Sequence, residues 1–275
     1  MLRIQFFLSE KPQNNRPIFF SAGTGDSNLF PCEDFRKTLQ TTLRRDGIEA
    51  LKYGDSCGFF PLRTTIAHVL ASQGLQTSPE NILITNGSQQ ALLLVSQLLL
   101  KPGDIVLVEM PTYGGAIELF QTFNLRIVGI PTDSGGMMVE KLERLFQQYH
   151  PRLIYTIPNF HNPTGTCLSS QRRMELLTLA DRYNIPILED DFVGDLRFEG
   201  RAQPALKAID PGGRVIYVST FSKMLMPGLR VGFLVTEGPI SERLISLKQV
   251  NDLASNTLKE IFFSVRFLFR QNWEF

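Results

Sequence analysis

The stretch VIYVSTFSKMLMPGLRVGFLV, residues 215–235, decides the fold. Its first half is a continuous apolar run, which is typical of a strand buried on both faces. The run ends in the hydroxyl-rich segment 219–223, so Lys223 stands at the carboxyl end of a buried strand. A second apolar run begins at Val231, too soon for a helical crossover between parallel strands. We therefore expect one of these two strands to run antiparallel to the rest of a sheet.

Short apolar runs and helical stretches alternate from residue 82 onward. This alternation predicts an α/β fold, a mostly parallel seven-stranded sheet between helices in an α-β-α sandwich. Further helices are expected before the sheet and after it, the last beginning at about Pro239. The expected strands are 82–85, 105–109, 125–130, 153–158, 185–191, 215–221 and 231–236, and the expected helices are 31–47, 58–74, 88–100, 114–123, 139–149 and 169–183.

Composition excludes several classes of protein. The chain has 275 residues with 28 basic and 27 acidic side chains, a balance that predicts no nucleic-acid binding. Its 3 cysteines are scattered, which argues against disulfides and a zinc site. No run approaches the ~18–20 apolar residues of a membrane span. The N-terminal apolar run lacks a signal cleavage site, so we expect a cytoplasmic protein.

Ligands of open α/β sheets bind outside the carboxyl ends of the strands. Each residue found there has an ordinary alternative role: a helix cap, a turn or a surface charge. A nucleotide hydrolase could use the pair Asp190–Asp191, but that function also requires a Gly-x-x-x-x-Gly-Lys-Ser/Thr loop, which this sequence lacks. The predicted strand ends deliver Gly87, Ser88 and Gln89, then Tyr113, Asn162, Asp190, and finally Thr220, Ser222 and Lys223.

Together these residue types favour one cofactor, pyridoxal 5'-phosphate (PLP). A lysine amine forms a Schiff base with its aldehyde, and a carboxylate partners its pyridinium nitrogen. An aromatic side chain stacks on the ring, and an amide donates to the phenolic oxygen. Hydroxyls, a helix N-terminus and a forked arginine hold a phosphate.

The sequence resembles the fold-type I PLP enzymes, the aspartate aminotransferase superfamily. It is most similar to 2-aminoadipate-type aminotransferases and to the aminotransferase-like domains of MocR/GntR-type regulators, over about residues 20–258. The resemblance rests on YGDSCGFFPLR (53–63), ITNGSQQAL (84–92), PTY (111–113), PNFHNPTG (158–165), ILEDDF (187–192) and STFSKMLMPGLRVGF (219–233).

The resemblance assigns a role to each residue. Lys223 would be the Schiff-base lysine, and Asp190 would bond the pyridinium N–H. Asn162 would donate to the phenolic oxygen, and Tyr113 would stack on the ring. Tyr53 would reach the phosphate of the partner subunit, and Gly23 would border the substrate. The phosphate would be bound by Gly87, Ser88, Gln89, Thr220, Ser222 and Arg230.

The implied reaction is transamination between an amino acid and a 2-oxo acid, catalysed by a homodimer. The incoming amino acid displaces Lys223, and the freed amine removes the α-proton. Nearby positive charge would lower the pKa of that amine.

Two departures from the family are visible. Phe192 stands where the family commonly has a tyrosine that bonds the phenolic oxygen. The small C-terminal domain, with its carboxylate-binding arginine, has no counterpart, and Arg266 and Arg270 are poor candidates for that role. We therefore expect a truncated chain: an N-terminal segment and helix (1–50), a large PLP-binding domain (51–258) and an atypical apolar tail (259–275).

Three alternatives to an aminotransferase stay open. The first is the effector domain of a PLP-dependent transcription regulator, which an upstream winged helix-turn-helix would indicate. The second is a PLP lyase or decarboxylase on the same fold. The third is an α/β binding domain without PLP.

Overall fold

The computed structural model describes residues 23–268, except residues 24, 195, 197–198 and 200–202, and side chains as far as Val265. The N-terminal apolar run and the side chains of Arg266 and Arg270 lie outside this range. No helix in the described part of the chain has the length and apolar character that a bilayer crossing requires.

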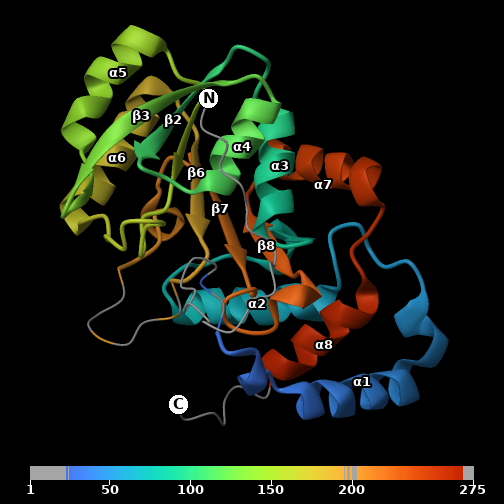
Figure 1. Ribbon diagram of the computed structural model, residues 1–275. Helices are drawn as coiled ribbons and strands as arrows, with labels where there is room; N and C mark the ends of the chain where they lie inside the picture. Colours follow the sequence, from blue (N-terminus) through green and yellow to red (C-terminus); the bar gives the residue numbers. More distant parts are fainter. Residues whose placement is uncertain (1–22, 24, 195, 197–198, 200–202, 269–275) are drawn as a thin grey trace, which may run out of the picture.

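One sheet organises the molecule, with the strand order β1-β8-β7-β6-β5-β2-β3-β4 (Figure 1). The pairs from β7 through β6, β5 and β2 to β3 are parallel. Strand β8 runs antiparallel to both β7 and β1, which confirms the predicted reversal after residue 221. The strands are β1 (Ile82–Thr85), β2 (Ile105–Met110), β3 (Arg126–Asp133), β4 (Gly136–Met137), β5 (Leu153–Thr156), β6 (Ile187–Asp191), β7 (Val215–Thr220) and β8 (Gly232–Val235).

The sheet has eight strands, so the expected number of seven is wrong by one. The additional strand, β4, pairs only Met137 and Gly136 with the end of β3. A pairing of two residues after a tight turn leaves no hydrophobic period in the sequence, which is why the pattern did not predict it.

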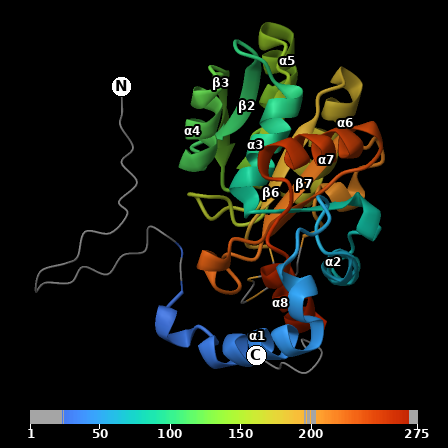
Figure 2. The ribbon, with the colours of Figure 1, turned by 90° about the vertical axis from the view of Figure 1, so that its right-hand side faces the viewer.

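Helices lie on both faces of the sheet, as predicted (Figures 1 and 2). Helices α3, α4 and α7 cover one face, and their core includes Leu92, Phe120 and Leu244. The other face is covered by α5 and α6 over the central strands and by α2 and α8 over β7, β8 and β1. The helices are α1 (Cys32–Asp46), α2 (Phe60–Ser72), α3 (Ser88–Leu99), α4 (Gly114–Thr122), α5 (Leu142–Tyr149), α6 (Ser170–Tyr183), α7 (Pro239–Asp252) and α8 (Thr257–Leu268).

Helix α8 contains the start of the predicted tail. The boundary expected after Leu258 falls inside this helix, which packs between α1 and α2 (Figure 2). Phe262 and Phe263 are buried, and the Phe262 ring meets Phe35 of α1 edge to face at 4.7 Å. The start of the expected apolar tail is thus packed against the rest of the chain, with residues 260–264 buried.

Candidate functional site

The carboxyl ends of β1, β2, β5, β6 and β7 lie at one edge of the sheet, because these strands run in the same direction. The segments that follow them carry the predicted residues. Helix α3 begins directly after β1, α4 after β2, and a turn with Asn162 follows β5. Asp190 is the penultimate residue of β6, and Lys223 comes three residues after the end of β7.

Lys223 is half-buried at this edge. Burial, and then the charge of the Arg230 guanidinium, hold the pKa of its ammonium below the ordinary value. Both causes disfavour the charged form, so they increase the fraction of neutral amine, which is the nucleophilic form. A Cβ atom built on Gly23 would lie 3.8 Å from Lys223 Nζ, so the N-terminal segment borders the lysine at this glycine.

Asp190 is 3% exposed. The Tyr155 hydroxyl donates to its Oδ2 at 2.9 Å, whereas its Oδ1 has no hydrogen-bond partner among the described residues. Burial raises the pKa of this carboxyl to about 7, although the Tyr155 hydrogen bond acts in the opposite direction. A buried acceptor without a donor is costly, so Asp190 Oδ1 is a natural position for an N–H group of a ligand.

Tyr113 caps the start of α4 and is half-buried. Its hydroxyl lies 3.5 Å from Gln89 Oε1, which connects the segment after β2 with the first turn of α3. Burial, and then the charge of Asp190, raise the pKa of the phenol, which places its ring within electrostatic reach of that carboxyl.

The turn between β1 and α3 forms a cradle with Arg230. Gly87 has φ = 80° and leaves the first turn of α3 without a side-chain cap. Arg230 Nη2 donates to the Asn86 carbonyl at 3.4 Å, and a Cβ on Gly87 would come within 2.2 Å of that nitrogen. Only glycine allows the Arg230 guanidinium to lie so close to the backbone at residue 87. The backbone N–H groups of Ser88 and Gln89, which no side chain caps, therefore lie near this guanidinium.

Hydroxyl groups after β7 complete the cradle. Arg230 Nη1 donates to Ser222 Oγ at 3.2 Å, and Ser222 Oγ lies 2.9 Å from Thr220 Oγ1. Arg230 itself has a left-handed backbone with φ = 53°, which is uncommon for a residue other than glycine. Two hydroxyls, a guanidinium and free helix N–H groups are a donor set suited to a phosphate.

Sequence reasoning missed Tyr155, although Asp190 was predicted. Residues alternate between the faces of a strand, and Tyr155 pairs with Leu188 of β6. Asp190 is two residues further along β6 and therefore on the same face. The only signal was a tyrosine in the apolar run LIYT, and a fully buried run does not reveal which face a residue takes.

A buried acid and histidine were also missed. Glu109 ends the apolar run of β2, and its Oε2 lies 3.2 Å from His161 Nε2 and accepts from the Ile157 N–H at 2.9 Å. His161 Nδ1 in turn lies 2.9 Å from Thr164 Oγ1. These contacts hold the turn that carries Asn162 against the end of β2.

Helix α8, which packs on the other face of the sheet, also contacts the cradle. The Lys259 ammonium donates to the Asn86 side chain and, at 2.9 Å, to the Arg230 carbonyl. The Asn86 amide donates to Asp252, which also pairs with the buried Lys248 at 2.9 Å. Lys259 lies in the expected tail, so sequence reasoning gave it no role.

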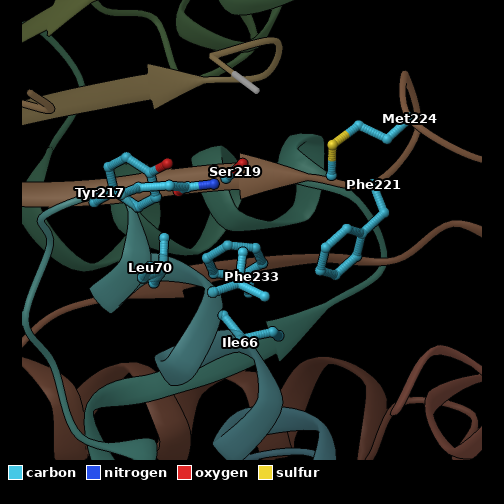
Figure 3. A pocket seen from close by; sticks show the side chains of 9 residues that line it. Ile66, Leu70, Tyr217, Ser219, Phe221, Met224 and Phe233 are labelled. Carbon is cyan, nitrogen blue, oxygen red and sulfur yellow. The ribbon is translucent and has the colours of Figure 1, made fainter. Parts of the chain in front are cut away.

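Two further observations concern residues away from the cluster. Tyr53 lies in the loop before α2, and this residue is 85% exposed. A cavity between α2 and strands β7 and β8 lies on the other face from Asp190 (Figure 3). None of the predicted site residues lines it; its walls include Ile66, Leu70, Tyr217, Ser219, Phe221, Met224 and Phe233.

Comparison with known families identifies the family of this chain. The family model "Aminotransferase class I and II" matches residues 20–258. The chain belongs to this family. The match ends just before Lys259, so it covers every residue assigned to the candidate site.

Relatives with two kinds of name are similar to the chain. Aromatic-amino-acid aminotransferase 1 of Thermococcus litoralis is 38% identical over 250 residues, which are 89% of this chain and 60% of the relative. The HTH-type transcriptional regulator YisV of Bacillus subtilis is 38% identical over 240 residues, 86% of this chain and 49% of the relative. The chain thus spans about half to two thirds of the length of such relatives.

Solved structures share the fold. The α-aminoadipate aminotransferase LysN of Thermus thermophilus superimposes with a TM-score of 0.85 at 34% identity, covering 90% of this chain and 63% of that one. That crystal structure contains N-(5'-phosphopyridoxyl)-L-leucine. The predicted fold class is confirmed by this agreement.

Proposed function

We propose that this chain is the cofactor-binding part of a PLP-dependent aminotransferase, which moves an amino group between an amino acid and a 2-oxo acid. The observation that carries the proposal is the environment of Asp190. Its Oδ1 is buried without a hydrogen-bond partner among the described residues, at the same sheet edge as Lys223 and Arg230. A pyridinium N–H is the donor that such a carboxylate would take.

The other donors fit the remaining groups of PLP. Lys223 supplies the amine for the aldehyde, and Asn162 supplies an amide for the phenolic oxygen. Tyr113 supplies a ring beside the pyridine. The phosphate would be bound by the donor set of the cradle: Gly87, Ser88, Gln89, Thr220, Ser222 and Arg230.

Lys223 would act twice, first as the covalent attachment point and then as the base at the substrate α-carbon. Its lowered pKa favours the neutral amine needed for both steps. When bound, the pyridine ring of PLP withdraws the electrons left behind on that carbon. Asp190 would accept a hydrogen bond from the protonated ring nitrogen, and Gly23, which has no side chain beside Lys223, would leave space for the substrate.

A cytoplasmic homodimer is part of the proposal. Tyr53 is 85% exposed in this chain, as expected for a residue that completes the phosphate site of a partner subunit.

Covalent attachment provides the test. We expect purified protein mixed with PLP to gain a visible absorbance band, and borohydride reduction followed by peptide mass spectrometry to locate the cofactor on Lys223. Lys223→Ala should lose both signals, whereas the exposed control Lys101→Ala should keep them. Absence of the band, or modification spread over several surface lysines, would contradict the proposal.

A second candidate function is effector binding in a transcription regulator, favoured by the 38% identity to YisV. The two functions differ in turnover. The loaded protein is mixed with a single amino acid and a different 2-oxo acid as amino acceptor, and the 2-oxo acid formed from the amino acid is measured over time. An aminotransferase releases it in proportion to enzyme, whereas a sensing domain binds the amino acid with a spectral change and no continued release.

A further inference from the structure

Two tyrosines donate to the two neighbouring aspartates of β6. Tyr155 of β5 donates to Asp190 Oδ2 at 2.9 Å, and Tyr217 of β7 donates to Asp191 Oδ2 at 3.0 Å. Tyr155 pairs with Leu188 and Tyr217 with Glu189, so each tyrosine bonds the aspartate two residues beyond its own partner. The two pairs are equivalent in register and lie on opposite faces of the sheet.

Packing holds the first of these tyrosines in place. Tyr155 is completely buried, and the Phe120 ring packs against it edge to face at 5.8 Å. This packing fixes the phenol so that its hydroxyl meets only one oxygen of Asp190. The second oxygen remains without a partner among the described residues.

We propose that Tyr155 is a positioning residue for the cofactor: its hydrogen bond to Asp190 Oδ2 keeps that side chain a carboxylate, so that the proton shared through Oδ1 stays on the ring nitrogen. This inference rests on the proposed function. It adds a residue of β5 that does not itself touch the cofactor.

The physical reason is the burial of Asp190. Burial favours the protonated acid and raises the pKa to about 7, and the charge of Asp191 adds to this effect. A hydrogen bond to the charged form opposes both. Burial and then the charge of Asp190, with smaller contributions from Glu109 and Tyr113, raise the pKa of the Tyr155 phenol well above its ordinary value, so the phenol remains a donor.

The consequence concerns one proton, which is held either by the ring nitrogen or by the Asp190 carboxyl. With the tyrosine, Asp190 is the weaker base and the nitrogen is a pyridinium. Without it, Asp190 holds the proton more tightly and the nitrogen becomes neutral. The ring then draws electrons less strongly from the substrate carbon.

The experiment uses the full chain loaded with PLP that carries ¹⁵N in the ring. At neutral pH we expect the wild-type resonance at the pyridinium position. Tyr155→Phe should move it toward the neutral position and weaken cofactor retention about tenfold. Tyr217→Phe is the matched control, because it removes the equivalent hydroxyl on the other face, and should leave the resonance in place.

A second variant tests the inference even if Tyr155→Phe fails to fold. Replacing Tyr155 by 3-fluorotyrosine keeps the shape but makes the hydroxyl a stronger donor, so the resonance should stay at, or move further toward, the pyridinium position. A wild-type resonance in loaded Tyr155→Phe, or a shift toward neutral with fluorotyrosine, would overturn the inference alone. Failure of wild-type protein to take up PLP would overturn the proposed function and this inference with it.

Discussion

Each face of the sheet carries a hydrogen-bonded tyrosine–aspartate pair, and the two pairs serve different purposes. On the face covered by α3, α4 and α7, the Tyr155–Asp190 pair leaves one carboxylate oxygen without a partner among the described residues. On the other face, Asp191 accepts from Tyr217, and the turn at Gly194 approaches so closely that a Cβ there would lie 2.4 Å from Asp191 Oδ1. One face thus keeps an acceptor for a ligand, whereas on the other face the turn at Gly194 lies against the carboxylate.

The comparison teaches that two consecutive residues of one strand can serve different purposes, one in ligand binding and the other in the stability of the fold. Because side chains alternate, Asp190 and Asp191 share a strand but not an environment. Substitutions on the α2–α8 face should therefore change stability, and substitutions on the α3 face should change cofactor chemistry.

The largest effect is expected at Phe262, which is 1% exposed and packs on Phe35 and Phe263. Phe262→Ala should lower the free energy of unfolding by about 3–5 kcal/mol, because it leaves a cavity under α8. Urea denaturation measures this loss, and Val250→Ala on the exposed surface of α7 is the control. The folded fraction should still attach PLP. Loss of attachment in protein shown to be folded would break the comparison.

Asp190→Asn should have the converse effect. It removes the carboxylate that would hold the ring nitrogen, and we expect amino-group transfer to fall on the order of 10²–10³-fold, as for loss of one electrostatic stabilising group. Asp191→Asn, which keeps an oxygen for Tyr217, should lower transfer by less than about tenfold, since one hydrogen bond is weakened. Equal losses for both variants would show that the two faces are not functionally separate.

The pH dependence of the cofactor-free protein sharpens the same point. Folding raises the pKa of the Asp190 carboxyl from 3.8 to about 7. As the pH rises, this carboxyl therefore ionises in the unfolded chain before it ionises in the folded protein. The contribution of Asp190 to stability is therefore greatest below about pH 4, falls as pH rises to about 7, and is constant above. Asp190→Asn removes this dependence and should exceed wild type at pH 8 by on the order of 2 kcal/mol in thermal or urea unfolding. An equal difference at pH 4 and pH 8 would contradict the assignment.

A smaller effect is expected at the cradle. Gly87→Ala would push a methyl group into Arg230 and should weaken PLP binding about tenfold, roughly the loss of one charged hydrogen bond. Gly103→Ala is the matched control, since Gly103 has φ = 90° with no atom within 4 Å of a built Cβ. The two variants share the backbone strain and differ only in the contact. Equal dissociation constants, measured by fluorescence titration, would argue against a phosphate at Gly87.

Sequence patterns predicted the elements that have a regular hydrophobic pattern and the turns that separate them. Continuous apolar runs located the long strands, and the early return at Val231 predicted the antiparallel strand. The resemblance named Lys223 and Asp190, whose roles stay predictions. Patterns could not predict Tyr155 or Lys259, because their partners depend on register between strands and on packing of α8. The sequence of α8 is apolar, but its local pattern does not indicate which elements the helix packs against.

The position of β1 has a consequence for the order of events during synthesis. In the sheet, β1 pairs only with β8, although the chain makes Ile82–Thr85 early and Gly232–Val235 late. Until β8 has emerged from the ribosome, the turn at Gly87 has no template to hold it beside Thr220 and Ser222. Such a distant pairing closes slowly. The nascent polypeptide would therefore assemble this cradle only after Gly232–Val235 has been made, whatever the supply of vitamin B6.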